Sequence, residues 1–309
     1  MQPDHCLMSP MKIADTPVTS HSYCNHTFYL KRDDLLHAHF SGNKARKLMS
    51  LLAYEDPSVT HLIGYGSPQA NSLLSLAALA SLKGWQLEFY VDRIPEWLKS
   101  TPIGNYRQAL ALGAKVIPVS EVCEQNMHPE TYIQRHRLDE SCLFVPEGGR
   151  SPIAEEGVAK LADEIAVWAE NQAVERLVVA LPSGTGTTAL FLHKHLKPKG
   201  IEVVTCACVG GKDYLIKQFE ELGEQCFPTI LETDRNHHFG KLYKDDYEIW
   251  HALKEKTGVE FELLYDPLMW HCLLDWLPQQ PDKQLLYVHQ GGLMGNESML
   301  PRYRRKFGD

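Results

Sequence analysis

The chain has 309 residues, of which 44% are hydrophobic and 23% are charged, a composition typical of a folded globular protein. The 39 acidic residues outnumber the 31 basic ones, and this net charge of −8 argues against binding to nucleic acid. No apolar run is long enough to span a membrane, the start does not resemble a signal peptide, and the eight cysteines include no CxxC pair. We therefore expect a cytoplasmic protein with reduced thiols.

Short apolar runs alternate with helical patterns along most of the chain. Strands are predicted at residues 61–65, 87–91, 115–119, 177–181, 202–208, 260–265 and 284–289. Helices are predicted at residues 71–83, closed by Gly84, at residues 103–112, and from the turn after residue 181 to about residue 197. This alternation predicts an α/β fold with parallel sheets. The polar stretch 121–150 is the least regular, and we expect a connection between domains there.

Six consecutive small residues follow the predicted strand at 177–181 and precede a helix: Ser183, Gly184, Thr185, Gly186, Thr187 and Thr188. A turn of this kind at a helix start brings backbone N–H groups together, adds hydroxyl donors and attracts negative charge through the helix dipole. The segment is neither a Walker loop nor a complete GxGxxG fingerprint. We interpret it as a phosphate site, with an ordinary tight turn as the alternative.

A second segment places a lysine at a predicted helix start. The positive end of the helix dipole disfavours a cation at this position, so Lys44 has more reason than a surface lysine to be a neutral, nucleophilic amine. The alternative is that Lys44, Arg46 and Lys47 form a solvated helix face. From the residue pattern alone, the solvated face is favoured.

Two neighbouring motifs change that balance: Lys31-Arg32-Asp33-Asp34-Leu35 and Gly42-Asn43-Lys44-x-Arg46-Lys47-Leu48. Together they resemble the signature of the 1-aminocyclopropane-1-carboxylate deaminase and D-cysteine desulfhydrase family. Enzymes of this family depend on pyridoxal 5′-phosphate (PLP) and have the tryptophan-synthase-β type of fold, PLP fold type II. The resemblance implies that Lys44 is the Schiff-base lysine, that the 183–188 loop holds the cofactor phosphate, and that Asn71 binds the cofactor's 3′ oxygen.

The same resemblance implies a domain organisation. It predicts two parallel-sheet α/β domains with the cofactor in the cleft between them. Residues 1–50 plus 157–309 would form a larger, discontinuous domain, and residues 51–156 a smaller inserted one. The family also leads us to expect a homodimer.

The expected substrate residues depart from the family pattern at several positions. Ala70 replaces a serine that contacts the substrate, and Met269 replaces an active-site tyrosine in the stretch Asp266-Pro267-Leu268-Met269. Trp270 follows where the family has Thr or Glu near the pyridine nitrogen, Phe239 replaces a second tyrosine, and Gln290 replaces a threonine. We expect a substrate site formed by Gln69, Ala70, Ser72, Phe239 and Met269. In an alternative alignment, shifted by a few residues, Tyr265 supplies the missing hydroxyl.

The resemblance implies a PLP-dependent lyase or deaminase acting on a small amino acid. Because several hydroxyls of the family pattern are missing, we rank D-cysteine desulfhydrase-like β-elimination above cyclopropane deamination. The elimination gives pyruvate, ammonia and sulfide, whereas opening of the cyclopropane ring needs a well-placed acid or nucleophile. Racemisation, dehydration of a hydroxy amino acid, and a PLP-binding protein with little or no turnover stay open. No metal site and no membrane partner are predicted.

Overall fold

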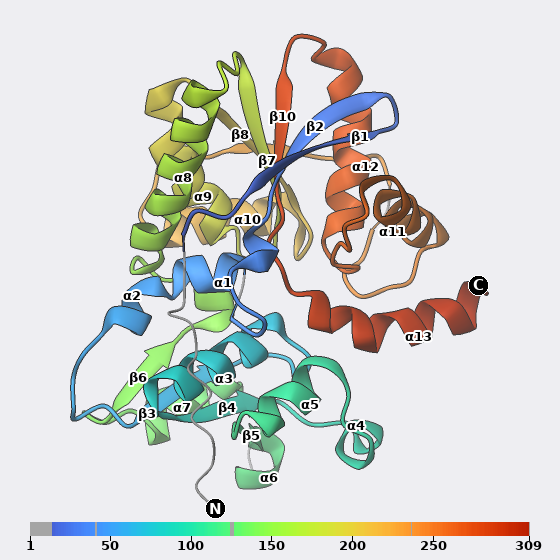
Figure 1. The fold of residues 1–309 in the computed structure, drawn as a ribbon. Helices are drawn as coiled ribbons and strands as arrows, with labels where there is room; N and C mark the ends of the chain where they lie inside the picture. Colours follow the sequence, from blue (N-terminus) through green and yellow to red (C-terminus); the bar gives the residue numbers. More distant parts are fainter. Residues whose placement is uncertain (1–13, 41, 124–126, 236, 309) are drawn as a thin grey trace, which may run out of the picture.

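Two sheets organise the part of the chain that the computed structural model describes, residues 14–40, 42–123, 127–235 and 237–308 (Figure 1). The larger, six-stranded sheet has the order β1-β2-β10-β7-β8-β9. Its strands are β1 (Val18–Tyr23), β2 (His26–Lys31), β7 (Leu177–Ser183), β8 (Glu202–Ala207), β9 (Thr229–Leu231) and β10 (Gln284–Val288). Only the β1–β2 hairpin is antiparallel among these pairs, so the rest of the sheet is parallel.

The smaller, four-stranded sheet is parallel throughout and has the order β5-β4-β3-β6. Its strands are β3 (His61–Tyr65), β4 (Gln86–Val91), β5 (Lys115–Pro118) and β6 (Cys142–Val145). All four lie within the predicted inserted domain, whereas the six strands of the larger sheet lie outside it. The predicted boundaries fall inside α2 and α8, so the exact division of the chain stays a prediction.

Helices cover both faces of each sheet, as expected for parallel strands. They are α1 (Gly42–Lys47), α2 (Met49–Ala53), α3 (Asn71–Lys83), α4 (Glu96–Ser100), α5 (Gly104–Ala111), α6 (Val119–Val122), α7 (Pro129–His136), α8 (Ala154–Asn171), α9 (Thr187–Leu196), α10 (Gly211–Glu221), α11 (Lys244–Thr257), α12 (Asp266–Trp276) and α13 (Asn296–Phe307). On the larger sheet, α8 and α9 pack on one face and α11 and α12 on the other (Figure 1). The α/β fold predicted from the sequence is confirmed. No helix in the described ranges is long and apolar enough to cross a bilayer.

One expectation about secondary structure was wrong. Residues 260–265, predicted as a strand, form a turn that leads into α12, because the Glu262 carboxylate accepts hydrogen bonds from the backbone N–H groups of Leu264 and Tyr265. Residues 121–150, predicted as a connection between domains, contain α7 and β6. Strand β6 is an edge strand of the smaller sheet, and the residues after it lead to α8 on the larger sheet, so a connection between domains within this stretch stays a prediction.

The orientation of two cysteines also differs from the expectation. The strand predicted at residues 202–208 would place Cys206 and Cys208 on opposite faces, yet their sulfur atoms lie 3.6 Å apart. Strand β8 ends at Ala207, so Cys208 no longer follows the alternation of a strand. Both thiols are buried and free.

A buried ionic network fixes helix α1, which carries Lys44, to the larger sheet. The guanidinium of Arg46, with no exposed surface, donates to Asp33 at 2.8 and 2.9 Å and to Glu164 on α8 at 2.6 and 2.9 Å. Lys31 at the end of β2 adds a 2.6 Å contact to Glu164. A buried, fully hydrogen-bonded network of this kind defines a unique geometry, and removing one partner is typically costly. The network therefore orients α1, and the expected alternative of a solvated helix face is wrong, since Arg46 and Lys47 are both buried.

Candidate active site

A cavity of about 550 Å³ lies at the carboxyl ends of β3, β7 and β10, where ligands of parallel α/β folds bind. Its walls also include α1 and the N-terminal ends of α3, α9 and α12. Every cofactor and substrate residue expected from the sequence lines this cavity except Met269: Lys44, Gln69, Ala70, Asn71, Ser72, Ser183, Gly184, Thr185, Gly186, Thr187, Thr188 and Phe239.

The loop after β7 forms a pocket of donors at the start of α9. The backbone passes through Gly186 with φ +71°, a conformation that favours glycine, and a Cβ there would lie 2.4 Å from the side chains of Leu215 and Phe219. Thr187 and Thr188, which begin α9, line the cavity, and the N–H groups of a first helical turn have no partner within the helix. The Ser183 hydroxyl bonds to Thr205 at 2.7 Å, whereas the Thr188 hydroxyl is buried without a partner among the described residues.

Helix α1 brings Lys44 to the cavity through contacts with the end of β10. The Asn43 amide donates to the Gln290 side chain at 3.0 Å, and the Asn43 N–H donates to the Gln290 carbonyl at 3.2 Å. Gly42 has φ +60°, and a Cβ there would lie 1.6 Å from that same carbonyl oxygen. The close approach therefore requires glycine at the residue that begins α1.

Two lysines of α1 share this part of the cavity wall. Burial lowers the pKa of Lys44 to about 8. A hydrogen bond with Lys47 and the negative charge of Glu147 raise this pKa, but their effects are smaller. Burial, together with the positive charge of Lys44, lowers the pKa of Lys47 well below its usual value. The Lys47 ammonium also donates to the Gly148 carbonyl. More of Lys44 is consequently unprotonated near neutral pH than of an ordinary lysine, and the neutral amine is the form in which lysine acts as nucleophile or base.

Asn71 begins α3 and is oriented by a residue that the sequence did not point to. The Asn105 amide donates to the Asn71 side-chain oxygen at 2.8 Å and to the Gln69 carbonyl at 2.9 Å. With its oxygen occupied, Asn71 has its side-chain N–H₂ available as a donor to a ligand. Asn105 is 1% exposed on α5, and no motif distinguishes it from an ordinary polar helix residue.

The structure corrects the expected tyrosine position. Met269 is fully buried in the core next to α11 and does not line the cavity, and Trp270 packs against Phe28 and Tyr287 in the same core. Tyr265 lines the cavity instead, as in the alternative alignment. Met269 and Trp270 lie within the first turns of α12 and are buried, whereas Tyr265 immediately precedes that helix. Its ring lies near Gly184, where a Cβ would be 3.6 Å from the phenol oxygen.

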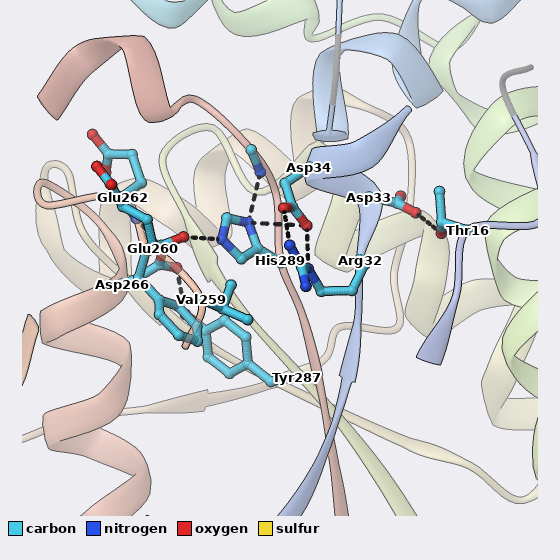
Figure 2. A network of polar contacts seen from close by, with 12 residues as sticks. Thr16, Arg32, Asp33, Asp34, Val259, Glu260, Glu262, Asp266, Tyr287 and His289 are labelled. Atoms are coloured by element: carbon cyan, nitrogen blue, oxygen red, sulfur yellow. Dashed lines mark hydrogen bonds and ion pairs between the residues drawn. The ribbon is translucent and has the colours of Figure 1, made fainter. Parts of the chain in front are cut away.

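Two buried carboxyl groups, Glu262 and Asp266, lie beside Tyr265. The sequence motifs assigned no function to either of them. Burial and the nearby Asp266 raise the pKa of Glu262 to about 8, and burial also raises the pKa of Asp266. Asp266 accepts from the Tyr287 hydroxyl at 2.6 Å and from the Glu262 N–H at 2.7 Å (Figure 2). One oxygen of Glu262 is buried without a partner among the described residues, although the residue lines the cavity.

These features fit PLP, the cofactor that the motif resemblance implies. The N-terminus of α9 and the unpartnered Thr188 hydroxyl supply donors for a phosphate, and Lys44 supplies a partly neutral amine for the aldehyde. The free N–H₂ of Asn71 supplies a donor for a ring oxygen. The unpartnered oxygen of Glu262 is a further polar group with room for a ligand. The donor set thus matches the phosphate, aldehyde and hydroxyl of this cofactor.

Comparisons with known proteins agree with this fit. The chain is 25% identical over 291 residues to a putative 1-aminocyclopropane-1-carboxylate deaminase of Thermotoga maritima, covering 86% of this chain and 89% of the relative. It is 23% identical over 290 residues to a bifunctional D-cysteine desulfhydrase/1-aminocyclopropane-1-carboxylate deaminase of Arabidopsis thaliana, covering 86% and 72%. The crystal structure of an ACC deaminase homologue superposes with a TM-score of 0.73 at 23% identity, covering 94% of this chain and 93% of that one.

The family relationship predicted from the two lysine motifs is therefore confirmed, as is the fold type. The model of one family, described as pyridoxal-phosphate dependent enzyme, matches residues 10–235, which is most of the chain. The chain belongs to the family of pyridoxal-phosphate dependent enzymes.

Proposed function

We propose that this enzyme releases ammonia from a small amino acid by β-elimination, with D-cysteine as the leading substrate. The observation that carries the proposal is the buried amine of Lys44, with its pKa lowered to about 8, in a cavity that also contains Tyr265. The names of the relatives from Thermotoga maritima and Arabidopsis thaliana, a deaminase and a desulfhydrase/deaminase, support the same reaction class.

Each protein group has a task in this reaction. When bound, PLP supplies an electron sink for the negative charge that develops at Cα. Lys44 takes the proton from Cα, because its amine is partly neutral at working pH. The backbone N–H groups at the start of α3, beside Gln69 and Ala70, hold the substrate carboxylate.

Tyr265 is the proton donor to the leaving group. Burial, and then the charge of Glu262, raise its pKa far above the usual value, so the phenol keeps its proton throughout the neutral range. Elimination of a thiolate needs little of this help, whereas opening of a cyclopropane ring needs much more. Ala70 adds no hydroxyl to the site, so D-cysteine ranks first. The presence of Tyr265 in the cavity makes 1-aminocyclopropane-1-carboxylate the second candidate.

The test is release of 2-oxo acids by the PLP-loaded protein from a panel of amino acids. We expect pyruvate from D-cysteine at a higher kcat/KM than from L-cysteine, and a slower release of the four-carbon 2-oxo acid from 1-aminocyclopropane-1-carboxylate. Lys44→Ala should abolish both. A protein that binds PLP but releases no 2-oxo acid from any of these substrates would contradict the proposal and would indicate a PLP-binding protein with little turnover.

A further inference from the structure

Arg302 is a cation at the cavity wall that the proposed reaction does not use. It lies on α13, which contacts α5 of the smaller domain and α11 of the larger one (Figure 1). Its guanidinium donates to the Gly240 carbonyl at 3.3 Å and lies 3.1 Å from the sulfur of Met299, both uncharged partners. No carboxylate within the described ranges forms an ion pair with Arg302. The residue is exposed as well as cavity-lining, so it lies where the cavity opens to solvent.

Two aromatic side chains that line the cavity are also exposed to solvent. Trp97 on α4 is 59% exposed and Phe239 is 42% exposed, and both line the same cavity. The three side chains come from three separate segments. Exposed aromatic rings beside an unpaired arginine are typical of a surface that recognises a ligand.

The reacting carbon determines which part of a substrate reaches Arg302. Cα must lie at Lys44, and the substrate carboxylate is assigned to the start of α3, so only the side chain can extend toward the opening. The other charged residues in the cavity wall are Lys44, Lys47, Glu147, Glu262 and Asp266. The two cations of this set, Lys44 and Lys47, both lie on α1, so Arg302 is the cation available to the outer end of a side chain.

We propose that Arg302 recognises a carboxylate on the leaving group, so that the enzyme favours S-substituted cysteines whose sulfur carries an acidic group. This inference rests on the proposed β-elimination. For S-carboxymethylcysteine, the Cα proton moves to Lys44, and the Cβ–S bond breaks with its electron pair leaving on sulfur. Water then hydrolyses the remaining three-carbon fragment to pyruvate and ammonia. The balance is S-carboxymethylcysteine plus water giving pyruvate, ammonia and thioglycolate.

The experiment compares two substrates of nearly the same shape. S-Carboxymethylcysteine carries a negative charge where S-carbamoylmethylcysteine carries a neutral amide, and both are made from either enantiomer of cysteine. Binding to the PLP-loaded protein is measured from the change in visible absorbance, and turnover from pyruvate release. We expect the charged substrate to be favoured about three- to ten-fold in Kd and kcat/KM, as for one partly exposed charge-assisted contact.

Variants of two arginines on the same helix test the assignment. Arg302→Gln should bring the charged-to-neutral ratio close to one, and Arg302→Glu should invert it. Arg305→Gln removes a similar charge from α13 at a residue that does not line the cavity, and it should leave the ratio unchanged. Added salt should reduce the ratio in the unmodified protein, since exposed charges are screened.

The outcomes separate this inference from the proposed function. Pyruvate release without a preference between the two substrates would overturn the role of Arg302 and leave the β-elimination intact. A preference in Kd without pyruvate would support the role of Arg302 and contradict the β-elimination. A preference that persists in Arg302→Gln would also overturn the inference.

Discussion

The ring of Tyr265 lies against the ring of Phe239, with centroids 5.1 Å apart and planes inclined by 54°. Both residues line the cavity, so the phenol that we assign as proton donor is held between an aromatic ring and the 183–188 loop. Phe239 offers no hydroxyl to share this task. The proposed proton transfer therefore depends on the phenol of Tyr265, where the family pattern has two active-site tyrosines.

Tyr265→Phe tests that dependence. Removing the hydroxyl should reduce turnover of 1-aminocyclopropane-1-carboxylate by about 10²-fold or more, and turnover of D-cysteine by less, because general acid catalysis contributes about 10²–10⁴-fold where it is needed. The measurement is kcat/KM on both substrates. Met269→Leu is the control, since it changes a buried core residue by a similar volume and should cost below about 1.5 kcal/mol of stability. Equal activity of Tyr265→Phe and the unmodified protein would contradict the assignment.

Two glycines of the 183–188 loop should respond differently to substitution. A Cβ at Gly184 would lie 3.5 Å from the Tyr265 ring, with no clash, so Gly184→Ala should weaken PLP binding while leaving the free energy of unfolding nearly unchanged. Gly186→Val should destabilise the protein by about 1–3 kcal/mol or more, because its side chain would collide with Leu215 and Phe219. Absorbance titration with PLP and chemical denaturation measure the two effects. Unchanged PLP affinity in Gly184→Ala would indicate that the loop is a plain turn.

The buried Glu262 should give the stability a characteristic pH dependence. Burial raises its folded-state pKa to about 8, above the usual value of 4.5, so the folded chain holds this proton more tightly than the unfolded chain. The resulting stabilisation is complete below about pH 4.5 and is lost as the pH rises toward 8. Glu262→Gln removes this titration while its amide oxygen can still accept from Leu264 and Tyr265.

Denaturation at several pH values checks this prediction. The free energy of unfolding of Glu262→Gln, relative to the unmodified protein, should increase between pH 5 and pH 8. A difference that is constant over this range would mean that Glu262 is not held protonated by its surroundings.

Much of the fold could be predicted from local sequence patterns. The apolar runs at β3, β7 and β10 are fully or nearly fully buried parallel strands, and such strands are marked by continuous hydrophobic residues. The glycine-rich turn before α9 could also be predicted from the sequence. The turn at Glu262 could not, because its strand-like apolar pattern is overridden by a side-chain carboxylate that binds two backbone N–H groups.

The candidate site was predictable where one motif supplies one residue, as for Lys44 and Asn71. It was not predictable where a long-range contact decides the outcome. Asn105 acts through a 2.8 Å hydrogen bond to Asn71 from a different helix, and no spacing in the sequence records that contact. The tyrosine was misplaced because an Asp-Pro pair at residues 266–267 resembles the family's Asp-Pro, while the start of α12 places Tyr265, and not Met269, in the cavity.

The central claim is that Lys44 holds the cofactor, and borohydride trapping tests it most directly. The PLP-loaded protein is reduced, digested and mapped by mass spectrometry. The account predicts one modified lysine, Lys44, and a rate of PLP incorporation that rises with pH through about 8 as the amine loses its proton. Lys47→Ala, the matched control one turn away, should still be modified at Lys44, whereas Lys44→Ala should give no adduct. An adduct on Lys47 or another lysine of the unmodified protein, or no adduct at all, would contradict the account.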